Sequence, residues 1–203
     1  MYYKNLNTVF VQITKNASSS VDQILSDRPG DTHTHDTLGS TQDRFGHLIN
    51  DETFYFAIVR NPVDRFISAY CYLVEERQRQ TESEGPEFAW KYGPIETLEI
   101  IKNMNQREVH ELDMVFLTQN YFLQPLPNSE PKVKLLVYEN LEHSWIQMAK
   151  FLQQRGLTNL ELPFSNKTKS KQGQWNDPLF LKLVHEIYAD DFQIHQRAIE
   201  SDK

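Results

Sequence analysis

Two short stretches of the chain combine a positive charge with small polar residues, as phosphate-binding sites do. The first stretch is Lys15-Asn16-Ala17-Ser18-Ser19-Ser20. It lies between a predicted strand at residues 8–13 and a predicted helix at residues 18–25, and its serines occupy positions where helix caps are expected. Backbone N–H groups at a helix N-terminus attract an anion, and a mobile lysine and hydroxyl donors strengthen that attraction. The stretch therefore predicts a phosphate loop built without glycine. The alternative is an ordinary serine-capped helix with a solvated lysine.

The second stretch follows a predicted buried strand at residues 54–59. Arg60 stands at the carboxyl end of this strand, where its guanidinium can grip a phosphate through two parallel hydrogen bonds. Asn61 and Pro62 come next and favour a helix start, because asparagine is a good N-cap and proline suits the first helical position. Ser68 lies two helical turns along and can face the same ligand. The alternatives are a surface arginine and a helix serine without a role.

Strand and helix signals alternate along the chain, and this alternation predicts where the two stretches lie. A third strand is predicted at residues 133–138, and further helices at residues 95–104, at residues 141–154 and from Asp177 through Phe192, whereas residues 27–52 read mainly as loop. Such a pattern predicts an α/β fold in which a central parallel sheet is flanked by helices in three layers. Ligands of such sheets bind beyond the carboxyl ends of the strands, where Lys15 and Arg60 are expected.

The composition excludes several classes of protein. The chain has 203 residues, a net charge of −7 and seven glycines, none with the spacing of a Walker or a dinucleotide-binding loop. The single Cys71 excludes an internal disulfide framework, and the acidity argues against a general nucleic-acid binder. No apolar run is long enough for a membrane span. We expect one domain over residues 1–203, soluble and cytoplasmic, although a lumenal domain cut from its anchor has the same composition; the sequence holds no signal for the oligomeric state.

The two stretches together resemble a known family. The run from Lys15 to Ser20 resembles the 5′-phosphosulfate loop of the sulfotransferases that use 3′-phosphoadenosine 5′-phosphosulfate (PAPS), and residues 59–70 (VRNPVDRFISAY) resemble their 3′-phosphate motif. The second motif is most similar to the carbohydrate branch, which includes the heparan 2-O-, chondroitin and HNK-1 enzymes. Three further similarities follow in order: Tyr138-Glu139-Asn140-Leu141, residues 163–169 (PFSNKTK) and residues 187–192 (IYADDF). Thr14 departs from the pattern, because a proline usually precedes the lysine.

The resemblance implies a P-loop-like sulfotransferase fold. It also implies transfer of a sulfuryl group from PAPS to an acceptor hydroxyl on a carbohydrate, with PAP as the product and no metal. Lys15 would neutralise the charge that builds on the leaving phosphate. The nucleotide would be held by residues of both motifs and of a third loop: Lys15, Asn16, Ala17, Ser18, Ser19, Ser20, Arg60, Ser68, Lys167, Thr168 and Lys169.

The acceptor hydroxyl must lose a proton in this reaction, and histidine is the side chain whose ordinary pKa suits that task near neutral pH. The candidates lie in the loop before the second strand, where the resemblance also places the base. His35 is the preferred base, His33 its assistant or substitute, and His47 a more distant choice. A metal site is a rival interpretation, because Asp31 and Asp36 flank the two histidines. A plain polar loop is another.

Two other functions remain open at this point. One is a small kinase-like phosphotransferase, against which the missing lysine–serine pair of a Walker loop counts. The other is a non-catalytic nucleotide-binding module, which would keep the contacts of Arg60 and Ser68 without any transfer. In the preferred interpretation the partners are a small-molecule nucleotide donor and a hydroxyl acceptor, not a nucleic acid. The aromatic residues Phe88, Trp90 and Tyr92 either line the acceptor pocket or anchor a helix.

Overall fold

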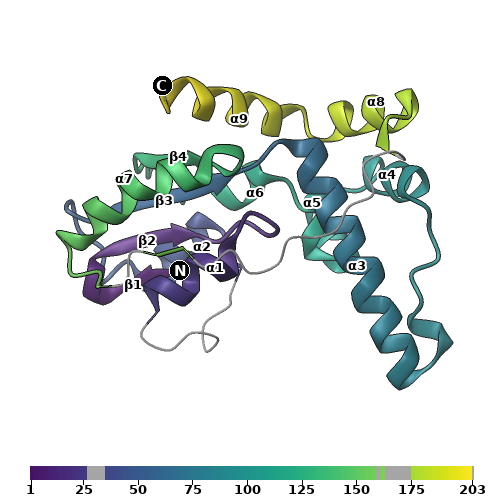
Figure 1. Ribbon diagram of the computed structural model, residues 1–203, viewed down its shortest axis with the longest axis horizontal. Helices are drawn as coiled ribbons and strands as arrows, with labels where there is room; N and C mark the ends of the chain where they lie inside the picture. The colour runs from purple at the N-terminus through teal and green to yellow at the C-terminus, as the bar shows by residue number, and fades with distance from the viewer. Residues whose placement is uncertain (27–34, 159–160, 163–174, 203) are drawn as a thin grey trace. The chain divides into compact units, whose positions relative to one another are not determined.

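The computed structural model describes residues 1–26, 35–158, 161–162 and 175–202 (Figure 1). The chain divides into two compact units, which are treated separately. Unit 1 comprises Met1–Arg60, Gln119–Ser165 and Ile194–Lys203, and unit 2 comprises Asn61–Thr118 and Asn166–Gln193. The single domain over residues 1–203 stays a prediction. Within the described ranges, no helix is both long and apolar enough to cross a membrane.

Unit 1 is built on a four-stranded sheet with the strand order β1-β2-β3-β4 (Figure 1). The β2–β3 and β3–β4 pairs are parallel, with Phe10 opposite Phe56 and Ile58 opposite Leu136, whereas β1 pairs antiparallel with β2. The predicted parallel sheet is thus confirmed for β2 to β4. The antiparallel β1 was not predicted, because two residues are too few to show a strand period. The elements of this unit are β1 (Tyr2–Tyr3), η1 (Lys4–Leu6), β2 (Thr8–Val11), α1 (Ser18–Leu25), α2 (Leu38–Phe45), β3 (Phe54–Val59), α6 (Gln119–Leu123), β4 (Val133–Val137), η4 (Tyr138–Asn140) and α7 (Leu141–Gln153).

Both faces of this sheet are buried. Phe10, Phe56, Ile58 and Leu136 face one side and pack in a single apolar cluster with residues of α1 and α7, among them Val21, Ile24, Leu25, Leu141, Trp145, Met148 and Leu152. Their neighbours along the strands face the other side and are also buried, including Val9, Val11, Ala57 and Val59. Strands covered on both faces read as continuous apolar runs, which is how β2 and β3 read in the sequence. The predicted α/β fold, with helices flanking a central sheet, is confirmed.

Unit 2 is helical. Its elements are α3 (Pro62–Glu84), η2 (Pro86–Phe88), α4 (Pro94–Lys102), α5 (Gln106–Leu112), η3 (Met114–Phe116) and α8 (Pro178–Ile187), and α9 (Ala189–Ser201) begins here and ends in unit 1. The predicted cap of α3 is confirmed, because Asn61 Oδ1 accepts from Val63 N at 3.0 Å and Pro62 is the first helical residue. The long final helix expected through Phe192 is instead two helices. They meet at Tyr188, whose hydroxyl donates to Phe116 O at 2.9 Å, and burial raises the pKa of this phenol.

Two local predictions were wrong in detail. The helix at residues 18–25 has the expected bounds, but its N-cap is Ala17 and not a serine. Residues 27–52 were expected to be mainly loop, yet α2 lies among them, and Thr37 Oγ1 accepts from Ser40 N at 3.0 Å as its cap. The helix contains Gly39, whose N–H donates to Gln124 O at 2.8 Å and whose Cβ, if present, would lie 3.2 Å from that same oxygen. This close approach of two backbones favours glycine at position 39, although glycine is otherwise unfavourable inside a helix.

Candidate functional site

The loop between β2 and α1 makes a tight turn without glycine. Lys15 and Ala17 both have left-handed backbones, with φ of 65° and 61°. Ala17 is the N-cap of α1 and makes no side-chain cap hydrogen bond, since alanine has no acceptor to offer. The helical hydrogen bonds begin with Val21 N to Ala17 O at 3.1 Å, so the N–H groups of residues 18–20 precede the first hydrogen bond of the helix. N–H groups in this position are the ones with which a helix start binds an anion.

The polar side chains of this loop divide into inward and outward groups. Asn16 is only 1% exposed, and its Nδ2 donates to Ile58 O at 2.8 Å and to Gln119 Oε1 at 2.7 Å. Ser18 is buried as well, and its Oγ donates to Ile13 O at 2.5 Å. Ser20 is also buried, whereas Ser19 is exposed and Lys15 half-buried. Lys15 and Ser19 are therefore the side chains of the loop that a ligand can reach, and Asn16 and Ser18 shape the loop from within.

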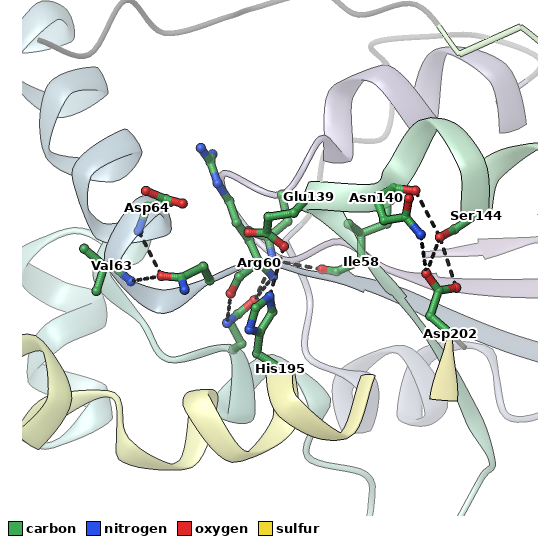
Figure 2. A network of polar contacts seen from close by, with 12 residues as sticks. Ile58, Arg60, Val63, Asp64, Glu139, Asn140, Ser144, His195 and Asp202 are labelled. Atoms are coloured by element: carbon green, nitrogen blue, oxygen red, sulfur yellow. Dashed lines mark hydrogen bonds and ion pairs between the residues drawn. The ribbon is translucent and has the colours of Figure 1, made fainter. Parts of the chain in front are cut away.

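Arg60 lies against this loop at the carboxyl end of β3 (Figure 2). Its Nη1 donates to Lys15 O at 3.2 Å, and its guanidinium carbon lies 4.2 Å from the centre of the Tyr138 ring, within the range of a cation–π interaction. Its Nε is buried and has no hydrogen-bond partner among the described residues. The structure thus brings Lys15 and Arg60, which are 45 positions apart, to the same edge of the sheet. Ser68 is buried on α3 in unit 2.

His35 is oriented by the end of β2. Its Nδ1 lies 2.9 Å from Gln12 O, and because a carbonyl oxygen only accepts, Nδ1 is the nitrogen that bears the hydrogen in this contact. In the neutral ring the lone pair is then on Nε2. Behind this contact, the Gln12 side chain donates to Tyr3 Oη at 3.1 Å and to Asp22 Oδ1 at 3.2 Å. Burial, and next the hydrogen bond to Asp22, raises the pKa of Tyr3, so this hydroxyl stays protonated and donates to Asp22.

Several predicted site residues lie outside the described residues: Asp31, His33, Lys167, Thr168 and Lys169. In the parts of the chain that the structure describes, no three His, Cys, Asp or Glu side chains gather in a way that could hold a metal ion. Because Asp31 and His33 are not among them, the metal interpretation of that loop stays untested. Asp36, its fourth candidate ligand, forms an ion pair with Arg44 at 2.9 Å.

Residues 138–140, which were noticed in the sequence but given no role, each make a distinct contact. The ring of Tyr138 packs against the guanidinium of Arg60. Glu139 Oε2 lies 2.9 Å from Nε2 of the buried His195 on α9. Asn140 Nδ2 donates at 2.8 Å to Asp202, which also accepts from Ser144 Oγ (Figure 2). This segment therefore joins the end of β4 to the C-terminal part of unit 1.

Gln119 belongs to the site although no motif in the sequence selects it. Its Oε1 accepts from Arg60 N at 2.9 Å, and its Nε2 donates to Arg60 O at 2.9 Å. It is fully buried at the first position of α6, 59 positions beyond Arg60. Local patterns cannot reveal a contact over such a separation. The only signal is the pair of polar residues Thr118-Gln119 after an apolar run at residues 115–117.

Comparison with known proteins places the chain in a family. Residues 2–196 match the model of the sulfotransferase family. The chain belongs to this family. The match covers both stretches of this sulfotransferase that the sequence predicts to bind phosphate, together with Gln119 and residues 138–140. No curated protein and no solved structure matches the chain.

The left-handed backbone at Ala17 predicts an unusual response to glycine. Ala17→Gly should change the free energy of unfolding by less than about 0.5 kcal/mol or stabilise the fold, because relief of the left-handed strain offsets the added freedom of the unfolded chain. Ala149→Gly, in the interior of α7, should cost about 1 kcal/mol or more. Denaturant unfolding of the two variants measures this difference. Equal losses would show that Ala17 bears no such strain.

The contact of His35 with Gln12 predicts one tautomer of the neutral ring. In ¹⁵N-labelled protein at alkaline pH, two-bond ¹H–¹⁵N correlations should show Nδ1 protonated and Nε2 unprotonated for His35. The exposed His110 on α5 provides the reference for an imidazole without this backbone acceptor. A protonated Nε2 in His35 would contradict the assigned orientation.

Proposed function

We propose that this sulfotransferase uses PAPS as its donor and holds it at the carboxyl ends of β2 and β3. The observation that supports this most directly is the start of α1, which has no side-chain cap and is flanked by Lys15 and Arg60. The buried Arg60 Nε fits the same group, because an unpaired buried donor is what a bound anion satisfies. Lys15, Ser19 and the N–H groups of residues 18–20 would hold the 5′ end of the donor, and Arg60 the 3′-phosphate. The roles of Ser68, Lys167, Thr168 and Lys169 rest on the resemblance alone and stay proposals.

Lys15 has the electrostatic role in this proposal. PAPS supplies the sulfuryl group, and transfer leaves negative charge on the phosphate oxygen from which sulfur departs. An ammonium group beside that oxygen lowers the barrier, because it neutralises charge that is larger in the transition state than in the ground state. The half-buried position of Lys15 reduces competition from water for this interaction.

His35 is the proposed general base. Its Nδ1–H donates to Gln12 O, so the lone pair of the neutral ring is on Nε2. Nε2 is the proposed acceptor of the proton of the acceptor hydroxyl as the new oxygen–sulfur bond forms. The backbone carbonyl both orients the ring and stabilises the imidazolium that results. The proposed role of His33, as an assistant or substitute for His35, rests on the sequence alone.

The acceptor is proposed to be a carbohydrate hydroxyl, on the similarity of residues 59–70 to the carbohydrate branch. Membership of the sulfotransferase family favours sulfuryl transfer over the kinase-like alternative. A non-catalytic nucleotide-binding module would bind PAP but transfer nothing to any saccharide. Incubation with radiolabelled PAPS and a panel of desulfated glycans separates these two functions.

PAP should stabilise the wild-type protein against heat. At 100 times its dissociation constant a ligand contributes about 2.7 kcal/mol, which for a chain of this size raises the melting temperature by about 5–10 °C. AMP lacks the 3′-phosphate that Arg60 is proposed to bind and should give a smaller shift. Differential scanning calorimetry measures both shifts, and no shift with saturating PAP would overturn the assignment of the donor.

Lys15→Met and His35→Ala should abolish most of the activity and leave the fold intact. Loss of the charge at Lys15 is expected to lower kcat about 10²–10³-fold, and loss of the base at His35 about 10²–10⁴-fold. Steady-state transfer assays measure kcat, and circular dichroism checks the fold.

The matched controls are Lys150→Met and His143→Ala, which remove the same side chains from exposed positions on α7. Both controls should keep wild-type kcat. Wild-type kcat in Lys15→Met or His35→Ala would refute the corresponding role.

A further inference from the structure

We propose that Gln119 is a positioning residue of the donor site, which fixes Arg60 and the Lys15 loop relative to each other. This inference rests on the proposed function, because the site that Gln119 shapes is the proposed site of PAPS. Gln119 is fully buried, so its side chain is not exposed to a ligand. It acts through the residues it holds.

Gln119 completes the backbone hydrogen bonding of β3 where the sheet stops. The last paired residues of β3 and β4 are Val59 and Val137, so Arg60 lies just beyond the ladder. The N–H and the C=O of Arg60 both bond to the Gln119 amide, each at 2.9 Å. A side-chain amide here does what a neighbouring peptide group does within a sheet, and it fixes the direction in which the Arg60 side chain leaves the backbone.

The same amide reaches the phosphate loop. Gln119 Oε1 accepts a second hydrogen bond from Asn16 Nδ2 at 2.7 Å, and Asn16 Nδ2 also donates to Ile58 O at 2.8 Å. The residue at position 119 must therefore accept from two donors and donate to one carbonyl. Glutamine meets both requirements, glutamate lacks the donor, and leucine lacks all three bonds.

Two features of the site depend on the hydrogen bonds that Gln119 makes to Arg60 and Asn16. Arg60 Nη1 reaches Lys15 O at 3.2 Å only while the end of β3 and the loop keep their present distance. The left-handed backbones of Lys15 and Ala17 flank Asn16, which is anchored through its side chain to Ile58 and Gln119. Release of Gln119 frees the loop on one side and the arginine on the other, so binding of the donor should suffer more than binding of the acceptor.

The decisive experiment compares Gln119→Leu with Gln42→Leu in the full chain. Gln42 is a buried glutamine of the same unit, whose Oε1 accepts from Leu126 N at 2.9 Å and whose Nε2 donates to Ser129 Oγ at 2.7 Å. Both variants should therefore lose stability in melting scans. Isothermal titration calorimetry with PAP should show Kd raised at least tenfold in Gln119→Leu and unchanged within twofold in Gln42→Leu. In transfer assays, KM for PAPS should rise in Gln119→Leu alone, with KM for the acceptor unchanged.

Gln119→Glu keeps the inference testable if the leucine variant does not fold. It retains an acceptor for Arg60 N and Asn16 Nδ2 but loses the bond to Arg60 O, so its Kd for PAP should lie between those of the wild type and Gln119→Leu, or, without the latter, at least threefold above the wild type. Wild-type Kd in every Gln119 variant that folds, with PAP bound by the wild type, would overturn this inference alone. Failure of the wild type itself to bind PAP would overturn the proposed donor and this inference with it.

Discussion

The polar backbone groups at the carboxyl ends of β2 and β3 must find partners beyond the sheet, and the shape of the site depends on how they do so. Arg60 bonds to the Gln119 amide, Ile58 O accepts from Asn16, and Gln12 O accepts from His35. Each partner is a side chain from another segment. Because buried N–H and C=O groups are costly to leave unpaired, this requirement draws the loop after β2 and the start of α6 to one place. Lys15, Arg60 and His35 take their positions from it.

The glycine-free loop between β2 and α1 is physically feasible because the fold supports its strained residues. A left-handed backbone costs about 1–2 kcal/mol for an ordinary residue, and this loop has two, at Lys15 and Ala17. Hydrogen bonds from Ser18 Oγ to Ile13 O and from Asn16 to Ile58 hold the turn from within. The scarcity of glycine therefore excludes the Walker and dinucleotide-binding loops, but it does not exclude the binding of a phosphate at the start of α1.

Residues 138–140 contribute to the structure through contacts with residues that are distant in the sequence. Tyr138 supports the guanidinium of Arg60, Glu139 pairs with His195, and Asn140 bonds to Asp202. Only the first of these contacts touches the site directly. The other two attach the C-terminal part of unit 1 to residues 138–140, so they stabilise the segment against which Arg60 packs.

The sequence by itself determined the three parallel strands, most of the helices, and the two strand ends at which Lys15 and Arg60 stand. Runs of apolar residues predicted β2, β3 and β4 to within two residues at each end. Asn61-Pro62 and Asp177-Pro178 predicted two helix starts, because apolar runs and caps depend on neighbours along the chain. Tertiary structure decided which side chains of the loop face inward, added β1 and α2, and selected Gln119. The side chains of Asn16 and Ser18 bond to backbone carbonyls within the protein, and their contact with a ligand stays a prediction. Hydrogen bonds between residues tens of positions apart depend on how strands and helices pack, and no local pattern encodes them.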